Sequence, residues 1–449
     1  MMLLQLGHAA TLALVLQAGA NARDSASAWL RSRTAAVTSG GAGTAAFDAK
    51  FDPVARHARV VGLGEATHGS REFGDVRFRL TQRAVEHAGY RIVALEGSAI
   101  RLSRLNDYVA GRASTLDTEV VEAGAQWIGR RTERQLIAWL RAWNGRHPKD
   151  PVWLLGVDPQ NFLLALPDLR DFLRRAYGDR IATVWTAIER EAAAADSQTY
   201  VFGDSRVDTV VRRQLFELVA ALQLDAPILR RLYGDSAYER AAEALAIIAE
   251  FADFNDTRSA IVGHWRDWYM AARVLRALSQ RQAAKAVYWA HNAHVAHAAG
   301  RSASAMNAPS GSVLRATLGC GYQAIAITFG EGAFVAQRPT DPDGRLAIDS
   351  LTPNVDDSVE GVMRRVASRT ALSAWGCIGD SVPVPSWLGR PQQMHWVGGV
   401  WLPGRDPAQA NRPTQLLRDY DALVYIPRVT ADEAPADRLV IPTRGRRVP

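Results

Sequence analysis

Residues 59–88, RVVGLGEATHGSREFGDVRFRLTQRAVEHA, show the pattern from which the fold follows. The apolar run over 59–63 predicts a short strand, and glycines at positions 64 and 69 bracket the turn that comes after it. From about 72 to 88, apolar residues recur every three to four positions, which predicts an amphipathic helix. A second apolar run, Tyr90–Leu95, follows at once. The segment therefore predicts a strand–helix–strand unit with parallel strands.

Further strands are predicted along the chain, where short runs rich in Val and Ile alternate with long helical patterns. They are Val152–Val157, Ala286–Ala290, Gln323–Phe329 and Ala422–Ile426. This alternation predicts an α/β fold with a mostly parallel central sheet that is flanked by helices.

The region from about 167 to 282 differs, because strand patterns nearly vanish and amphipathic stretches follow one another. The predicted helices are Pro167–Tyr177, Arg180–Ala195, Val210–Leu224, Pro227–Phe251 and Thr257–Ser279. We interpret the region as a large all-helical insertion that forms one side of the active-site cleft. The expected domains are a signal peptide (1–22), the first half of the α/β core (23–166), the insertion (167–282), the second half of the core (283–430) and a flexible basic tail (431–449). Small polar residues over 301–312, RSASAMNAPSGS, predict a flexible loop.

The composition is that of a globular protein, with 449 residues of which 48% are hydrophobic and 22% charged. It excludes whole-chain disorder, a collagen-like repeat and a small disulfide scaffold. The formal net charge is +7, but the bases are spread evenly and nearly all are arginines. A nucleic-acid-binding surface needs clustered bases, and the one cluster, Arg444 to Arg447, lies in the tail. No nucleic-acid partner is expected.

The N-terminus carries a compartment signal. Residues 3–20 form an apolar run that ends in Ala20-Asn21-Ala22, an A-x-A cleavage pattern, although no Lys or Arg precedes the run. We therefore expect a signal peptide, a mature chain that begins near Arg23, and a periplasmic or secreted protein; without export the location would be cytoplasmic. No other segment reaches the ~20 apolar residues of a membrane helix, so no stable membrane insertion of the mature chain is expected.

The two cysteines, Cys320 and Cys377, form neither a CxxC motif nor a zinc-ligand spacing. In an exported protein they could pair, because such proteins fold under oxidising conditions. The expectation from the sequence is nevertheless two buried free thiols, the ordinary state of isolated cysteines.

Polar residues follow four of the predicted strands, at the point where each strand ends. The first strand runs into Gly64-Glu65-Ala66-Thr67-His68-Gly69, the second into Glu96, the third into Asp158 and the fourth into His291-Asn292-Ala293-His294. In an open parallel sheet, ligands bind in the crevice beyond the carboxyl ends of the strands. We therefore expect these side chains to meet at one edge of the sheet.

Such a set of residues supports general acid–base chemistry. A histidine can take a proton from water at neutral pH, and a neighbouring carboxylate orients it and stabilises the imidazolium that forms. Carboxylates and histidines are equally the ingredients of a metal site, and the i, i+3 spacing of Glu65/His68 and of His291/His294 does not separate the two. The G-x-S-x-G, H-E-x-x-H and P-loop motifs are absent from the sequence.

Several ordered blocks resemble the erythromycin esterase family. Residues 64–73, GEATHGSREF, are similar to its signature, and Ala94–Gly97 and Leu155–Gln160 match downstream. Arg266-Asp267 with Met270 resembles its R-D-x-x-M segment, and residues 289–295, WAHNAHV, its W-A-H-N-x-H block. The blocks run in order from about residue 55 to the strand near 426, so the resemblance covers most of the chain.

The resemblance implies an α/β core with a helical insertion and hydrolysis of an ester, which in the best-known members is the macrolide lactone ring, with antibiotic resistance as the associated role. It implies that His68 is the general base that activates water, with support from Glu65, Glu96, Arg77 and His291. This chain departs from the family where Arg273 replaces a common asparagine and where residues 309–312 lack the usual M-G pair. These departures concern the substrate more than the mechanism.

The resulting prediction is a carboxylic ester hydrolase (EC 3.1.1) that acts on a small-molecule ester or lactone by water attack, without a cofactor or metal. His291 and Arg77 are expected to stabilise the oxyanion, and His294, Arg266 and Asp158 to bind substrate. Two alternatives stay open at this point. One is a metal-dependent hydrolase that uses the same Glu/His cluster as ligands, and the other is an exported protein that binds a small ligand without turnover.

Overall fold

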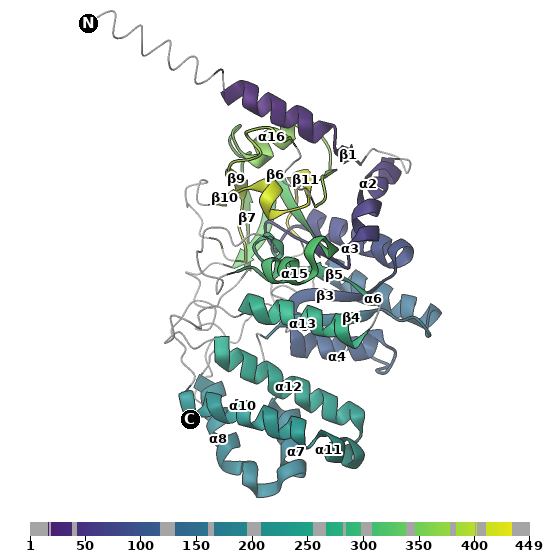
Figure 1. The fold of residues 1–449 in the computed structure, drawn as a ribbon, viewed down its shortest axis with the longest axis vertical. Helices are drawn as coiled ribbons and strands as arrows, with labels where there is room; N and C mark the ends of the chain where they lie inside the picture. Colours follow the sequence, from purple (N-terminus) through teal and green to yellow (C-terminus); the bar gives the residue numbers. More distant parts are fainter. Residues whose placement is uncertain are drawn as a thin grey trace, which may run out of the picture.

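The computed structural model describes residues 17, 19–37, 43–116, 131–159, 166–194, 208–254, 266–281, 284–297, 308–337, 346–377, 383–399, 401 and 410–432. They form a central sheet covered by helices on both faces, with a further group of helices beside it (Figure 1). Most of the predicted signal peptide and the basic tail after 432 lie outside the described residues. In the part of the chain that is described, no helix is both long enough and apolar enough to span a bilayer.

The central sheet has nine strands in the described residues, in the order β1-β8-β11-β6-β2-β5-β3-β4, with β7 paired to β6. Six strands run parallel, and they are β2 (Val60–Leu63), β3 (Tyr90–Ser98), β4 (Trp153–Asp158), β5 (Lys285–Trp289), β6 (Tyr322–Gln337) and β11 (Ala422–Val429). The antiparallel additions are β1 (Thr34–Ala36), β7 (Leu346–Leu351) and β8 (Ala371–Ala374). A separate pair is β9 (Gln392–His395) with β10 (Asn411–Thr414). The predicted α/β class with a mostly parallel sheet is confirmed.

The sheet lies between two hydrophobic cores because successive side chains of a strand point to opposite faces. Ile325 and Ile327 of β6 pack in one core, and Ala324 and Ala326 of the same strand pack in the other. The first core is closed by α2 (Gly43–His57), α3 (Arg71–Ala88), α4 (Ala99–Val109) and α6 (Arg131–Arg146). The second is closed by α13 (Arg266–Gln280), α15 (Ser310–Leu318), α16 (Val359–Val366) and α17 (Leu416–Asp419). Helix α3 is the helix that the sequence predicts over 72–88.

The helices between 166 and 254 pack on one another around a third hydrophobic core. They are α7 (Leu166–Tyr177), the short 3-10 turn η2 (Gly178–Ile181), α8 (Ala182–Ala194), α10 (Thr209–Leu224), α11 (Ala226–Tyr233) and α12 (Asp235–Phe254). The prediction of a single helix over 227–251 is wrong, because the chain forms two helices, α11 and α12, that Gly234 separates. Its φ of +83° is a backbone conformation that glycine adopts without the steric cost other residues meet, and it ends the first helix.

Helix α13 packs on the sheet through Met270, Ala271 and Val274, although the sequence groups it with the helical insertion. The expected loop over 301–312 is wrong at its end, since α15 begins at Ser310, while 301–307 lie outside the described residues. The physical reason is a contact that comes from far away in the sequence. The Asp267 carboxylate on α13 accepts a hydrogen bond of 2.7 Å from the backbone N–H of Ser310. An acceptor at the first turn satisfies a helix N–H group that would otherwise have no partner.

Cys320 and Cys377 form a disulfide with a Cα–Cα distance of 5.7 Å, so the expectation of two free thiols is wrong. Cys320 lies in the 3-10 turn η4 (Gly319–Gly321) directly before β6, and Cys377 follows β8. Strands β6 and β8 both pair with β11. The strand order thus brings together two cysteines that are 57 residues apart in the chain.

Candidate active site

The carboxyl ends of β2, β3, β4 and β5 lie side by side, as the strand order β2-β5-β3-β4 requires. The turn that holds Glu65 and His68 follows β2, and His291 follows β5 as the N-cap of the short helix α14 (Asn292–Val295). Glu96 lies near the carboxyl end of strand β3, within an irregularity of the strand between Leu95 and Ser98. Asp158 is the last residue of β4. The structure therefore brings the residues that the sequence singled out to one edge of the sheet.

The turn after β2 needs its glycines because other parts of the chain approach it closely. A Cβ on Gly64 would lie 2.0 Å from Oδ1 of Asn292, and one on Gly69 would lie 2.0 Å from the backbone oxygen of Val335. Asn292 itself joins the turn to the sheet, since its side-chain amide donates to the Ile327 carbonyl and accepts from the Ile327 N–H. The turn is thus held from both sides before any ligand arrives.

Glu65 is the centre of the first group of charged residues. Its Oε1 lies 2.7 Å from Nδ1 of His68, and its Oε2 lies 2.8 Å from Nη2 of Arg77 on α3. Burial by itself would raise the pKa of Glu65, but Arg77 and His68 outweigh burial and hold that pKa below its usual value. An ionised carboxylate only accepts hydrogen bonds, so Nδ1 of His68 carries a proton, and in the neutral imidazole Nε2 is then the nitrogen with the lone pair. The guanidinium of Arg77 lies 4.7 Å from the ring centre of Trp289.

His291 is buried beside His68, with the two ring centres 5.4 Å apart. Its Nδ1 accepts a hydrogen bond from the N–H of Ala293, so its Nε2 carries the proton and donates to the carbonyl of Ala66 at 3.2 Å. Burial is the main cause that lowers the pKa of His291 to about 3. His291 is therefore a neutral imidazole with both ring nitrogens bonded to backbone groups, and it holds the turn that carries His68.

Arg266, at the start of α13, is the centre of the second group. Its Nε and Nη2 donate to the carboxylate of Asp158, the shortest contact being 2.6 Å, and Nη2 also donates to Oε1 of Glu96 at 2.9 Å. The other oxygen of Glu96 accepts from the backbone N–H of His291 at 2.8 Å. Burial would raise the pKa of Glu96, but His294 and Arg266 hold it well below its usual value. Glu96 thus connects the Arg266 group to the segment that positions His291.

His294 completes this second group. Its Nδ1 lies 2.8 Å from Oδ1 of Asp267, and its Nε2 lies 3.2 Å from Oε1 of Glu96. Burial would lower the pKa of His294, but the two carboxylates outweigh burial and raise it to about 10. His294 is therefore an imidazolium that donates from both nitrogens, and its 3.2 Å contact with Nη1 of Arg266 is a contact between two cations that the surrounding carboxylates offset.

Two residues of the site were not assigned from the sequence. Asp267 directly follows Arg266 in the R-D-x-x-M segment, so its position was a usable signal, and it binds both His294 and the N-terminus of α15. Trp396 follows β9 and has no sequence signal, yet its ring centre lies 5.1 Å from that of His291. The next two residues anchor this tryptophan, because the N–H groups of Val397 and Gly398 both donate to the carbonyl of Ala66.

A metal site was an open alternative from the sequence. Among the described residues, no group of three or more His, Cys, Asp and Glu side chains is arranged so that it could hold a metal ion. In this structure Glu65 faces Arg77, and Glu96 faces Arg266 and His294, so each of the two carboxylates already has cationic partners.

Fold and site together define an α/β protein with two adjoining clusters of carboxylates, histidines and arginines at the carboxyl edge of a parallel sheet. The family model for erythromycin esterase matches residues 85–429 of the chain. The chain therefore belongs to the erythromycin esterase family. The matched range includes Glu96, Asp158, Arg266, His291 and His294, and it begins after the turn that holds Glu65 and His68.

The chain is similar to two erythromycin esterases of Escherichia coli. It is 25% identical to the type I enzyme over 261 residues, which make up 53% of this chain and 62% of that protein. It is 26% identical to the type II enzyme over 303 residues, which make up 63% of this chain and 71% of that protein. The matched part thus spans less than two thirds of the type I enzyme.

Solved structures show the same fold. A protein of Bacillus cereus aligns with a TM-score of 0.74 at 17% identity, over 92% of this chain and 99% of that chain. A succinoglycan biosynthesis protein aligns with a TM-score of 0.68 at 18% identity, over 92% and 98%. A variant of the erythromycin esterase EreC in its open conformation aligns with a TM-score of 0.61 at 20% identity, over 86% and 95%.

Proposed function

We propose that the protein hydrolyses a carboxylic ester or lactone, with His68 as the general base that activates the attacking water. The observation that carries the proposal is the geometry of the Glu65–His68 pair, 2.7 Å between Oε1 and Nδ1, at the carboxyl edge of the sheet. Membership of the erythromycin esterase family supports the class of reaction. A macrolide lactone is the first substrate to test, because the two similar proteins of Escherichia coli are erythromycin esterases.

In the proposed mechanism, Nε2 of His68 takes a proton from water as the water oxygen attacks the ester carbonyl carbon. Glu65 keeps the Nδ1 proton in place and stabilises the imidazolium that forms. The tetrahedral intermediate then collapses, and the imidazolium returns its proton to the leaving alkoxide. No covalent acyl-enzyme is needed.

The remaining residues act around this pair. Arg77 holds the second oxygen of Glu65, so the carboxylate has one orientation toward His68. Glu96 accepts from the backbone N–H of His291, and the His291 ring donates to the Ala66 carbonyl, so these two side chains hold the backbone around the site. The expected role of His291 as an oxyanion donor would require its Nε2 to release the Ala66 carbonyl. We assign substrate binding to Arg266 and His294, the cations of the second group, with Asp158 orienting Arg266.

The test is His68→Ala, assayed by mass spectrometry for gain of one water on a panel of esters and macrolactones that the wild type hydrolyses. A general base contributes about 10²–10⁴-fold to the rate, so the variant should lose at least that much kcat with an unchanged melting curve. The matched control is His87→Ala on the exposed face of α3, which should keep wild-type activity. If His68→Ala keeps more than about a tenth of kcat, His68 is not the base.

We further propose that the protein is exported, as the cleavage pattern at Ala20–Ala22 suggests. The Cys320–Cys377 disulfide supports this location, because such bonds persist mainly in oxidising compartments. Residues directly after the expected cleavage point pack on the domain, with Ala26 and Leu30 buried and Asp24 paired with Arg365. N-terminal sequencing of exported protein should give a start near Arg23, and a start at Met1 or Met2 would refute export by cleavage.

A further inference from the structure

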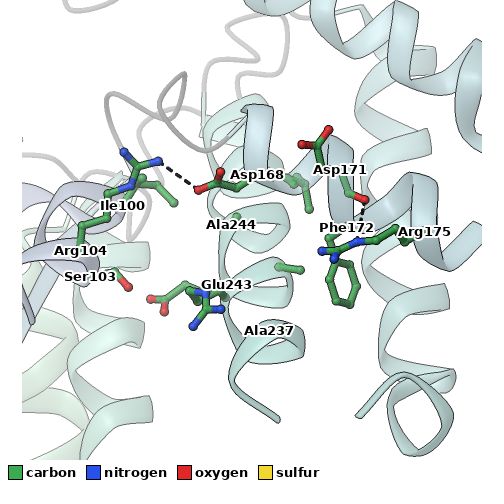
Figure 2. A pocket seen from close by; sticks show the side chains of 13 residues that line it. Ile100, Ser103, Arg104, Asp168, Asp171, Phe172, Arg175, Ala237, Glu243 and Ala244 are labelled. Atoms are coloured by element: carbon green, nitrogen blue, oxygen red, sulfur yellow. Dashed lines mark hydrogen bonds and ion pairs between the residues drawn. The ribbon is translucent and has the colours of Figure 1, made fainter. Parts of the chain in front are cut away.

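A cavity of about 380 Å³ lies between α4 and the helices α7 and α12 (Figure 2). Its lining contains none of the residues of the candidate active site. The volume falls within the range of about 300–1,000 Å³ that is typical of small-molecule sites. The cavity is therefore large enough to hold a small ligand.

The floor of the cavity is apolar. Ile100 of α4, Leu169 and Phe172 of α7, and Ala241 and Ala244 of α12 line it, and all five side chains are buried. The two alanines leave the space open where a larger residue on α12 would fill it. An apolar group placed here would be removed from water, with a gain of roughly 25 cal/mol for each Å² that it buries.

Charged side chains surround this floor, and each acidic one has its own cationic partner. Asp168 is 3.1 Å from Nη2 of Arg104 across the gap between α7 and α4, a pair that Figure 2 shows as a dashed line. Asp171 pairs with Arg170, which does not line the cavity, at 3.4 Å.

The third acidic residue of the lining, Glu243, also has an arginine partner. It pairs at 3.3 Å with Arg273, which again lies outside the lining. Arg273 is the residue that stands where the family commonly has an asparagine. The negative charges of the cavity are therefore matched by Arg104 and by arginines from outside it.

Two arginines of the lining, Arg175 and Arg240, are left without a carboxylate partner in the part of the chain that the structure describes. Nε of Arg175 donates to the backbone oxygen of Asp171, and its Cζ lies 5.8 Å from the ring centre of Tyr233, so Nη1 and Nη2 make no hydrogen bond within the described residues. The Arg240 side chain has neither a hydrogen bond nor an ion pair within the described residues. The cavity thus combines an apolar floor with two guanidinium groups that can receive an anion.

We propose that this cavity binds a small amphipathic anion, with an apolar tail on the floor formed by Phe172 and its neighbours and a carboxylate or phosphate head held by Arg175 and Arg240. Guanidinium groups suit such heads because their planar N–H donors match two oxygens at once. The cavity shares no lining residue with the His68 centre, so we expect that binding does not depend on catalysis.

The test is isothermal titration of the full-length protein with decanoate and with decyl phosphate, both below their micelle concentrations. We expect saturable binding of one molecule per chain for both probes, and binding at least about tenfold weaker for decanol and for inorganic phosphate, which each lack one half of the ligand. His68→Ala should bind decanoate as the wild type does, because His68 does not line the cavity.

The variants separate this site from general surface attraction. Arg175→Gln with Arg240→Gln should weaken decanoate binding at least about tenfold with an unchanged Tm, because both side chains are exposed. Arg231→Gln, an exposed arginine of α11 outside the lining, is the matched control and should bind as the wild type. Ala241→Phe should block the floor. No saturable binding, or equal binding by the double variant and the control, would overturn the proposal.

Discussion

The change Glu65→Gln tests the central feature of the proposed site. It keeps the size of a side chain that is only 6% exposed and removes its charge. In the wild type both carboxylate oxygens accept from donors, Oε1 from Nδ1 of His68 and Oε2 from Nη2 of Arg77. An amide has one oxygen and one NH₂ group, so it can accept from only one of these two donors.

The size of the effect follows from that mismatch. The charged Arg77 competes best for the amide oxygen, so the NH₂ group faces Nδ1 of His68 and forces that nitrogen to accept. The proton of His68 then moves to Nε2, where the base needs its lone pair. We expect kcat to fall about 10²–10⁴-fold. The loss of one buried charge should reduce the free energy of unfolding by about 3 kcal/mol, the lower end for breaking a buried ion pair.

The assay compares kcat on the fastest ester of the substrate screen with the Tm of the same preparation. The control is Glu133→Gln, because Glu133 is another buried carboxylate near Arg77, 3.9 Å from Nη2, and has no assigned part in the reaction. We expect the control to keep at least about half of kcat, since it leaves the donors on Glu65 unchanged. A Glu65→Gln enzyme that keeps more than a tenth of kcat would refute the reasoning about the tautomer of His68.

Three further predictions concern stability. The pKa of His294 is raised from 6.5 to about 10 in the folded chain, so its contribution to the free energy of unfolding is complete below pH 6.5 and is lost as the pH rises toward 10. Denaturant melts at a series of pH values should show this decline in stability, and His294→Gln should remove the decline. Reduction of the Cys320–Cys377 disulfide should lower the free energy of unfolding by about 2–4 kcal/mol, as the closed loop of 57 residues suggests, and an unchanged urea midpoint would contradict this. Arg273→Asn should cost about 3–5 kcal/mol because it leaves Glu250 buried without the Arg273 contact of 2.6 Å, and Glu250→Gln in the same chain should recover part of the loss.

The sequence by itself determined the features that depend on local pattern. The alternation of apolar runs with helical periods predicted six of the strands and helix α3, because an apolar run and a period of 3.6 are properties of neighbouring residues. It also predicted that Glu65, Glu96, Asp158 and His291 would meet, since the carboxyl ends of neighbouring parallel strands share one edge.

Only the tertiary structure decided which of these groups pair and in what protonation state. Arg266 reaches Glu96 across 170 positions of sequence, and the proton positions on His291 and His294 follow from burial and from partners on other elements. The Cys320–Cys377 bond and the position of Trp396 likewise follow from how strands and turns are placed side by side. Such contacts are not local, and the energy of a buried charge depends on its whole surroundings, so residue spacing alone does not encode them.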